Sequence, residues 1–322
     1  MKGTDLTVLS SRATRKGRVS LLAATMGIAA ALAPAFGAVD SRAPSAAQAE
    51  ARPNIESQRE QEHAKAETSL DREAVAAIAE TEKALAAVAK KDKKEALSAM
   101  ERATGKLNIL LARNQKTALI PVSFEVEVAD NAPVDPKAID GLADLTRSAL
   151  KERHFGSARA LLDTLRSEIR VRTYNLPLGT YPAALTTAAR LMEDGKHAEA
   201  TKVLTAALNT LVIVDKSTSI PLLEVEGALK HADEAAQKTD EKEKAQASAH
   251  LAAAKVALSR GEALGQIDDK SGKDFRKQLD DVERKLKGKE ATSSAFAKLR
   301  EEIASIFRKQ AQTENRGSAP KS

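Results

Sequence analysis

The sequence predicts a mainly α-helical protein: packed helical hairpins in one globular domain, with a small β element near residues 120–130 and two short C-terminal helices. The chain is 42% hydrophobic but only 2% aromatic, so its core must be built from Ala, Leu, Val and Ile, which favours closely packed helices. A short pattern also recurs three times, in which a polar break is followed by an alanine and then by Met or Leu four positions later. These pairs are Ala96 with Met100, Ala158 with Leu162, and Ala200 with Leu204.

The recurring pattern is typical of helical hairpins. A small alanine just after a tight turn lets two helices approach closely, and the residue four positions on lies on the same helix face. Successive alanines are 62 and 42 residues apart. This spacing is too irregular for an array such as the tetratricopeptide repeat of about 34 residues. We therefore expect hairpins packed into one globule, with a strict repeat scaffold as the alternative.

Residues 1–37 have the features of a secretory signal peptide. A basic stretch that ends at Arg18 precedes an apolar run, which Pro34 interrupts. Small residues permit cleavage before Ala38 or as late as residue 49. The alternative is an uncleaved anchor, because an apolar run of about 20 residues could just span a bilayer. With the signal removed, we expect a periplasmic or secreted protein without a stable membrane span.

Charge and composition exclude several classes of function. The net charge is +6, but most of this excess lies in the leader. The remainder is no electrostatic footprint for nucleic acid, and so few aromatic rings offer no stacking platform for single strands. The absence of cysteine excludes disulfides, thiolate metal sites and a thiol nucleophile.

The first elements follow from composition and periodicity. Residues 38–66 are rich in Ala, Ser, Pro, Glu and Gln and are predicted to be a disordered linker. Helical periodicity begins at Leu70 and predicts helices over 70–88 and 96–111. Residues 122–128 instead alternate Val or Phe with Ser or Glu, which is the pattern of a half-buried strand.

The middle of the chain returns to helical periodicity. Asp135 and Pro136 open a helix as its cap and first-turn residue. The periodicity predicts helices over 135–150, 158–169, 182–192, 200–211, 223–229 and 247–258. Segments 172–182 and 215–221 are predicted to be connections. The main helical domain is thereby expected to cover residues 67–266.

The end of the chain has a different character. Apolar residues spaced three and four apart predict two short amphipathic helices, over 275–286 and 296–306. They form a predicted C-terminal extension, residues 267–311, that packs on the main body or on a partner. Residues 312–322 are predicted to be a disordered tail.

Several short segments together resemble a known protein family. They are Thr104-Gly105-Lys106-Leu107, Leu119-Ile120-Pro121-Val122, Leu165-Arg166-Ser167-Glu168-Ile169, Asn175-Leu176-Pro177-Leu178, Thr180-Tyr181-Pro182, Ala207-Leu208-Asn209-Thr210-Leu211-Val212 and Ile220-Pro221-Leu222. In this order they resemble the YfdX family of exported proteobacterial proteins, over roughly residues 80–264. The resemblance implies a mostly helical periplasmic fold, a link to envelope stress, and chaperone-like or small-molecule binding. It carries over no catalytic residues.

The segment 173–182 holds both tyrosines of the chain, together with two prolines that restrict its backbone. A tyrosine offers an apolar ring with a polar tip, which suits the wall of a binding pocket. If a ligand groove exists, we expect Tyr174, Asn175 and Tyr181 to line it, followed by Asn209 and Thr210. The alternative is structural, because paired tyrosines often close a core by bonding to backbone carbonyls.

The chain has five histidines, and none has the spacing of a metal site. His154 and His197 occupy related hairpin turns, where imidazoles could gain charge in an acidified envelope. They are candidate pH-sensing residues, with ordinary polar turn residues as the alternative. We predict no metal site and no cofactor.

Serine-hydrolase, phosphate-loop and dinucleotide-binding motifs are absent. We therefore expect a non-enzymatic binding protein of the bacterial envelope, acting in stress response or as a chaperone-like factor. Its predicted partners are unfolded or envelope proteins, and a homo-oligomer fits the same picture. The alternatives are a soluble receptor for a small amphipathic molecule and, third, an uncharacterised enzyme.

Overall fold

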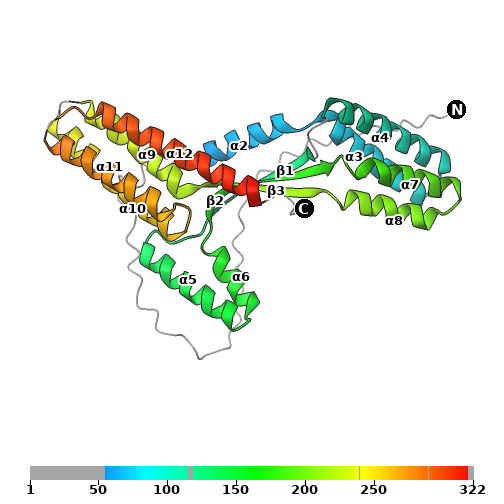
Figure 1. Ribbon diagram of the computed structural model, residues 1–322, viewed down its shortest axis with the longest axis horizontal. Helices are drawn as coiled ribbons and strands as arrows, with labels where there is room; N and C mark the ends of the chain where they lie inside the picture. Colours follow the sequence, from blue (N-terminus) through cyan, green and yellow to red (C-terminus); the bar gives the residue numbers. More distant parts are fainter. Residues whose placement is uncertain (1–54, 115–118, 239, 289, 318–322) are drawn as a thin grey trace, which may run out of the picture. The chain divides into compact units, whose positions relative to one another are not determined.

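Helices α2–α12 and a three-stranded sheet make up the described part of the chain (Figure 1). The computed structural model describes residues 55–114, 119–238, 240–288 and 290–317. The strands are β1 (Leu119–Asp130), β2 (Ser167–Pro177) and β3 (Val212–Ser219). The helices are α2 (Ile55–Ser69), α3 (Arg72–Ala89), α4 (Lys93–Arg113), α5 (Pro136–Lys151), α6 (Phe155–Asp163), α7 (Tyr181–Glu193), α8 (His197–Leu208), α9 (Ile220–Ala236), α10 (Glu241–Ala263), α11 (Asp269–Lys287) and α12 (Ser293–Gly317). The predicted fold class, mainly α with a small β element, is confirmed.

The alanine pattern marks three equivalent helical hairpins, α3–α4, α5–α6 and α7–α8. Ala96, Ala158 and Ala200 each lie at the start of the second helix and are fully buried. The residue five positions before each alanine lies in the turn and has a positive φ, of 59° at Lys91, 61° at Arg153 and 73° at Gly195. One turn geometry therefore serves all three hairpins, although only the third uses the residue that adopts it without strain.

Hairpins α3–α4 and α7–α8 pack on each other and share one hydrophobic core, here called the hairpin core (Figure 1). Helix α3 contacts α8, and α4 contacts α7. The contact surfaces are mainly alanine, with larger side chains such as Met100, Leu107 and Leu204 filling the space between helices. Asp71 and Asp92 cap α3 and α4 by accepting hydrogen bonds from backbone amides of the first turn.

The sheet is antiparallel with the order β1-β2-β3, so β2 is central. The strand predicted over 122–128 is confirmed as part of β1. The prediction of a connection over 172–182 is wrong for residues 172–177, because these residues belong to β2. The helix predicted over 158–169 is likewise too long, since α6 ends at Asp163, and β3 occupies most of the connection predicted over 215–221. Strand β2 does alternate polar and apolar residues, but Leu161, Leu165 and Ile169 are also spaced four apart, which is a helical spacing.

The two faces of the sheet differ. One face carries Val126, Val128 and Ile169, which pack with the first turn of α9 and with Phe307 of α12. Helix α2 contacts β1 and β2, and its His63 ring packs edge-on against Phe124 with centroids 4.8 Å apart. The opposite face carries charged and polar side chains, described with the candidate site below.

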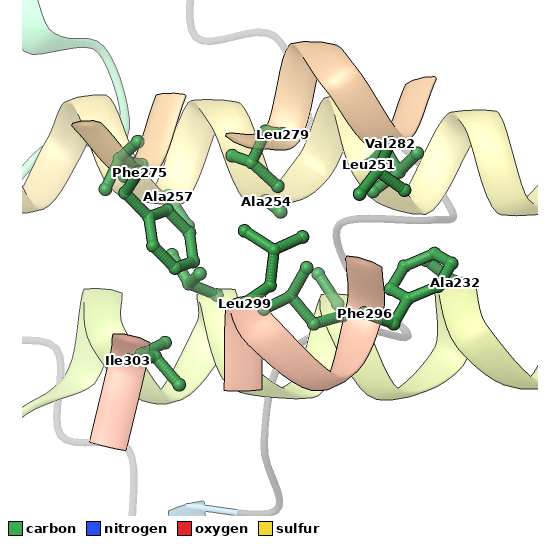
Figure 2. Close-up of a cluster of buried hydrophobic side chains, with 14 of the residues drawn as sticks. Ala232, Leu251, Ala254, Ala257, Phe275, Leu279, Val282, Phe296, Leu299 and Ile303 are labelled. Carbon is green, nitrogen blue, oxygen red and sulfur yellow. The ribbon is translucent and has the colours of Figure 1, made fainter. Parts of the chain in front are cut away.

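Helices α9–α12 share a second hydrophobic core, here called the C-terminal core. Figure 2 shows Phe296 and Leu299 of α12 pointing into the space between α10 and α11, where Leu251 and Leu279 lie. The predicted boundary at residues 266/267 therefore separates helices that are packed together. The C-terminal helices pack on the predicted main body, one of the two placements expected for them, because α9 and α10 bury their apolar faces against α11 and α12.

The ends of the described chain also differ from the predictions. The predicted linker, 38–66, contains most of α2, in which Glu62 pairs with Lys65 and lies 3.6 Å from Lys216 of β3. Helix α12 continues to Gly317, beyond the predicted start of the tail at residue 312. The predicted signal peptide, 1–37, lies outside the described residues. No described helix is both long and apolar enough to cross a membrane.

A buried arginine joins the sheet to the C-terminal helices. The Arg260 side chain of α10 is only 2% exposed, and its Nη2 donates to Asp130 Oδ1 at 2.6 Å and to the Ala132 carbonyl at 2.7 Å. Its Nε donates to the Pro133 carbonyl at 3.1 Å, and Nη1 lies 3.4 Å from Glu224 Oε2 of α9. The guanidinium thus links the end of β1, the loop before α5, and helices α9 and α10.

Candidate functional site

Both tyrosines of the predicted binding loop pack against the hairpin core. Tyr181, the first residue of α7, is buried inside it, and this burial raises the pKa of its hydroxyl to about 12, an effect that Thr81 partly offsets. Tyr174 of β2 lies at the margin of the same core, and its hydroxyl donates to Glu125 Oε1 at 3.1 Å. The two rings therefore contribute to packing at the junction between sheet and helices.

The three polar residues predicted beside them also make structural contacts. Asn175 is buried and donates its side-chain amide to the carbonyls of Thr173 and Val212, both at 3.1 Å. Both bonds are structural: the bond to Val212 links β2 to β3, and the bond to Thr173 stays within β2. Asn209 ends α8 and is exposed, and the Thr210 hydroxyl donates to the Ala207 carbonyl at 2.7 Å.

The polar face of the sheet carries a network of ion pairs, both between strands and within β2. Its central pair is bidentate, because Nε and Nη2 of Arg172 on β2 both lie 2.9 Å from carboxylate oxygens of Asp215 on β3. Arg166 donates to Glu127 of β1 at 2.7 Å, and Arg170 pairs with Glu168. The sequence analysis missed this network, since β2 and β3 were not recognised as strands. The alternation of arginines with apolar residues in β2 was the signal that could have revealed it.

The Arg172 guanidinium holds the pKa of Asp215 below its ordinary value of 3.8. A lowered pKa in the folded state means that the ionised carboxylate stabilises the fold above pH 3.8 and that this contribution is lost as the pH falls below it. We therefore expect D215N to be less stable than the wild type at neutral pH, with the difference closing in strong acid. Denaturant unfolding of both proteins across this pH range measures it, and a difference that stays constant with pH would contradict the assignment.

The two histidines predicted to sense pH lie on different hairpins and do not come together. His154 is exposed at the start of α6, with Nδ1 3.4 Å from Glu152. His197 begins α8, and its Nδ1 is buried without a hydrogen-bond partner in the described part of the chain. The structure instead brings together His231 of α9 and His250 of α10, with ring centroids 5.4 Å apart. No cluster of three or more His, Asp or Glu side chains suited to a metal ion occurs among the described residues.

A cleft of about 640 Å³ lies between α11 and α12. Its walls carry cations and carboxylates of both helices, with Val282 and Ala295 as apolar members. Within the wall, Lys285 pairs with Asp281 at 3.0 Å. The mixed charges leave no patch of one sign, so this cleft does not define a class of ligand.

Hairpin α5–α6 exposes large apolar side chains, which makes it the best candidate for a binding surface. We define the hairpin surface by its four exposed large apolar residues. They are Leu145 (43% exposed), Leu150 (47%), Phe155 (63%) and Leu162 (51%). Phe155 and Leu162 are seven residues apart and share one face of α6, while Leu150 lies in the last turn of α5, close to Phe155 across the connection. Grouped apolar side chains on a soluble surface typically mark interaction sites.

Comparison with known proteins gives the family of the central part of the chain. Residues 77–217 match the family model described as YfdX protein. This chain contains a YfdX domain. The match confirms the family that the sequence segments resemble. The domain runs from within α3 to within β3, so it includes the hairpin core, the hairpin surface and nearly all of the sheet, whereas helices α9–α12 follow it.

One solved structure and the curated proteins complete the comparison. A crystal structure of Salmonella Typhi YfdX is similar at 17% sequence identity, with a TM-score of 0.32, over 47% of this chain and 93% of that chain. No curated protein matches significantly.

Proposed function

We propose that this YfdX-domain chain is a non-enzymatic, exported binding protein of the bacterial envelope, which holds apolar segments of non-native proteins in a chaperone-like manner. The hairpin surface carries this proposal, because its apolar side chains are exposed to solvent. The contact between α5 and α6 is nevertheless tightly packed, since Ala158 is fully buried. A surface of this kind binds by burying apolar area and requires no catalytic group.

The other features of the chain support the same proposal. The predicted signal peptide directs the protein to a compartment where acid or chemical stress unfolds proteins, and the YfdX resemblance implies a role in envelope stress. Charged side chains lie beside the hairpin surface and favour its solubility. Asp144 and Arg147, for example, are both about 70% exposed and form an ion pair at 2.9 Å. A client would therefore meet an apolar strip bordered by charge.

The test is suppression of aggregation of an acid-unfolded client, followed by light scattering at neutral and mildly acidic pH. We expect the wild type to suppress scattering at a stoichiometric ratio and the double variant F155S/L162S to lose most of this effect. Both side chains are exposed, so the substitutions are expected to change stability by no more than about 0.5 kcal/mol each.

The matched control is I109S/I213S, which removes two side chains of similar exposure, 49% and 51%, from other parts of the chain. We expect this control to protect as well as the wild type. Absence of protection by the wild type at either pH would refute the chaperone-like function, and equal loss in both double variants would show that the hairpin surface is not the binding site.

A further inference from the structure

Helix α2 covers part of the apolar face of the sheet, but its own side chains are poorly suited to that position. It contacts β1 and β2, and its Glu62 lies near Lys216 of β3. Of its fifteen residues only Ala66 is buried, and Ile55 is its only large apolar residue. A helix that is polar on every side gains little from packing, and an isolated helix of about 15 residues is marginal in water. Helix α2 therefore depends on the sheet for its stability.

The sheet face beneath α2 is apolar and incompletely covered. Strand register places Phe124 and Val126 of β1, Val171 of β2 and Val214 of β3 on this face. Phe124, Val126 and Val214 remain half-buried, whereas most members of the hairpin core and the C-terminal core are fully buried. A helix with an apolar stripe in the same place would remove more apolar area from water than α2 does, and would bind more favourably.

A single ion pair joins the middle of α2 to this face. The Glu62 side chain is only 12% exposed and lies 3.6 Å from the Lys216 side chain, which is 56% exposed. Strand register places Lys216 on the same face as Val126 and Val171. A helix that takes the place of α2 must therefore offer a carboxylate to this lysine, because a cation beside an apolar interface is costly to leave without a partner.

We infer that the sheet face under α2 is a second binding surface, which α2 closes within the chain and which an amphipathic helix of another protein occupies when α2 is displaced. The occupant has the chemistry that α2 supplies only in part: an apolar stripe for Phe124, Val126 and Val214, and one carboxylate for Lys216. Recognition of an amphipathic helix through its apolar face is a recurrent mode of peptide binding. This surface is separate from the hairpin surface, so the inference can fail without the proposed function failing.

Charge variants of the full chain test the inference with a labelled peptide, an amphipathic helix of about four turns that has leucines on one stripe and a single glutamate beside it. E62K sets two lysines side by side, so we expect it to displace α2, to leave Lys216 available, and to raise the affinity for the peptide about three- to tenfold. K216E also displaces α2 but removes the cation that the peptide requires, so we expect no gain. The double variant E62K/K216E restores the ion pair in reverse and is expected to bind no more tightly than the wild type.

Hydrogen exchange followed by mass spectrometry measures the displacement of α2 without any ligand. We expect the amides of α2 to exchange faster in E62K and in K216E than in the wild type, and the double variant to exchange at nearly the wild-type rate. Exchange in the hairpin core and the C-terminal core is expected to stay unchanged, which verifies that each variant is folded.

A crosslink provides the matched control, because the chain contains no cysteine. The variant E62C/K216C is either bridged by a short bismaleimide, which fixes α2 on the sheet, or capped at both thiols with N-ethylmaleimide, which leaves α2 free. We expect the bridged form to bind the peptide at least about tenfold more weakly than the capped form, since the bridge removes the binding-competent state.

The results separate this inference from the proposed function. Equal binding by the bridged and capped forms overturns the inference, as does an E62K variant that exchanges no faster in α2 or binds no more tightly. A peptide with lysine in place of its glutamate that binds E62K equally well overturns the assigned chemistry of the occupant. If peptide binding is lost in F155S/L162S instead, the hairpin surface is the site, so the inference fails and the proposed function is supported.

Discussion

Replacing Arg260 with alanine is expected to lower the free energy of unfolding by about 3–5 kcal/mol, the range found when one partner of a buried ion pair is removed. The guanidinium is 2% exposed and serves two carboxylates, Asp130 and Glu224, as well as two backbone carbonyls. Alanine would remove the Arg260 cation from both carboxylates, which are themselves largely buried. Denaturant unfolding followed by far-UV circular dichroism measures the loss.

Two comparisons isolate the cause of this effect. R147A removes an arginine from an exposed ion pair and is expected to cost at most about 1 kcal/mol. The triple variant R260M/D130N/E224Q removes the charges together and is expected to recover part of the stability that R260A loses. A cost for R260A no larger than that for R147A would show that the buried network does not hold the sheet to the C-terminal helices.

Replacing Phe296 with alanine is expected to cost about 3–5 kcal/mol, as for other buried aromatic residues, and to loosen helices α9–α12 together. Its ring is fully buried in the C-terminal core, where Figure 2 shows it beside side chains of neighbouring helices. Alanine at this position would leave a cavity. The short side chains around it cannot move in to fill the space, because α9 and α10 contribute many alanines to this core. Denaturant unfolding again gives the magnitude.

The chain supplies its own control for Phe296. Phe155 is also near the start of a helix but is 63% exposed, so F155A is expected to change stability by no more than about 0.5 kcal/mol. A small effect of F296A would mean that α12 does not depend on the C-terminal core. The domain boundary at residues 266/267 would then describe the protein better than the shared core does.

The parts of the fold that are predictable from sequence are those fixed by local spacing. The alanine pattern identified three hairpins because a buried small residue just after a turn is a local requirement, and Ala96, Ala158 and Ala200 are all fully buried. Strand β1 was recognisable because residues 122–128 alternate strictly. Strand β2 alternates as well, but Leu161, Leu165 and Ile169 continue a four-residue spacing from α6 into it. The predicted helix therefore extends to residue 169, although α6 ends at Asp163.

The parts that escaped prediction depend on contacts between distant residues. Arg260 and Asp130 are 130 positions apart, and no local pattern connects them. The tyrosines were chosen as candidates because they are rare, yet Tyr181 lies inside the hairpin core because α7 packs against α4, which the sequence does not display. The hairpin surface was hidden for the opposite reason: Leu162 has the same local pattern as Met100 and Leu204, and only the absence of a neighbouring hairpin among the described residues exposes it.

The sheet register has a consequence for how such proteins change over evolution. The chain leaves β1 at Asp130 and re-enters β2 at its register partner Ser167, and it leaves β2 beyond Asn175 and re-enters β3 at Val212, the partner of that residue. The three strands are thus a simple meander, and each helical pair between them is an insertion whose two ends emerge side by side. Insertions of this kind can be lengthened, shortened or exchanged without disturbing strand pairing. Proteins that descend from one ancestral meander could thereby acquire new binding partners by replacing a single helical pair between two strands.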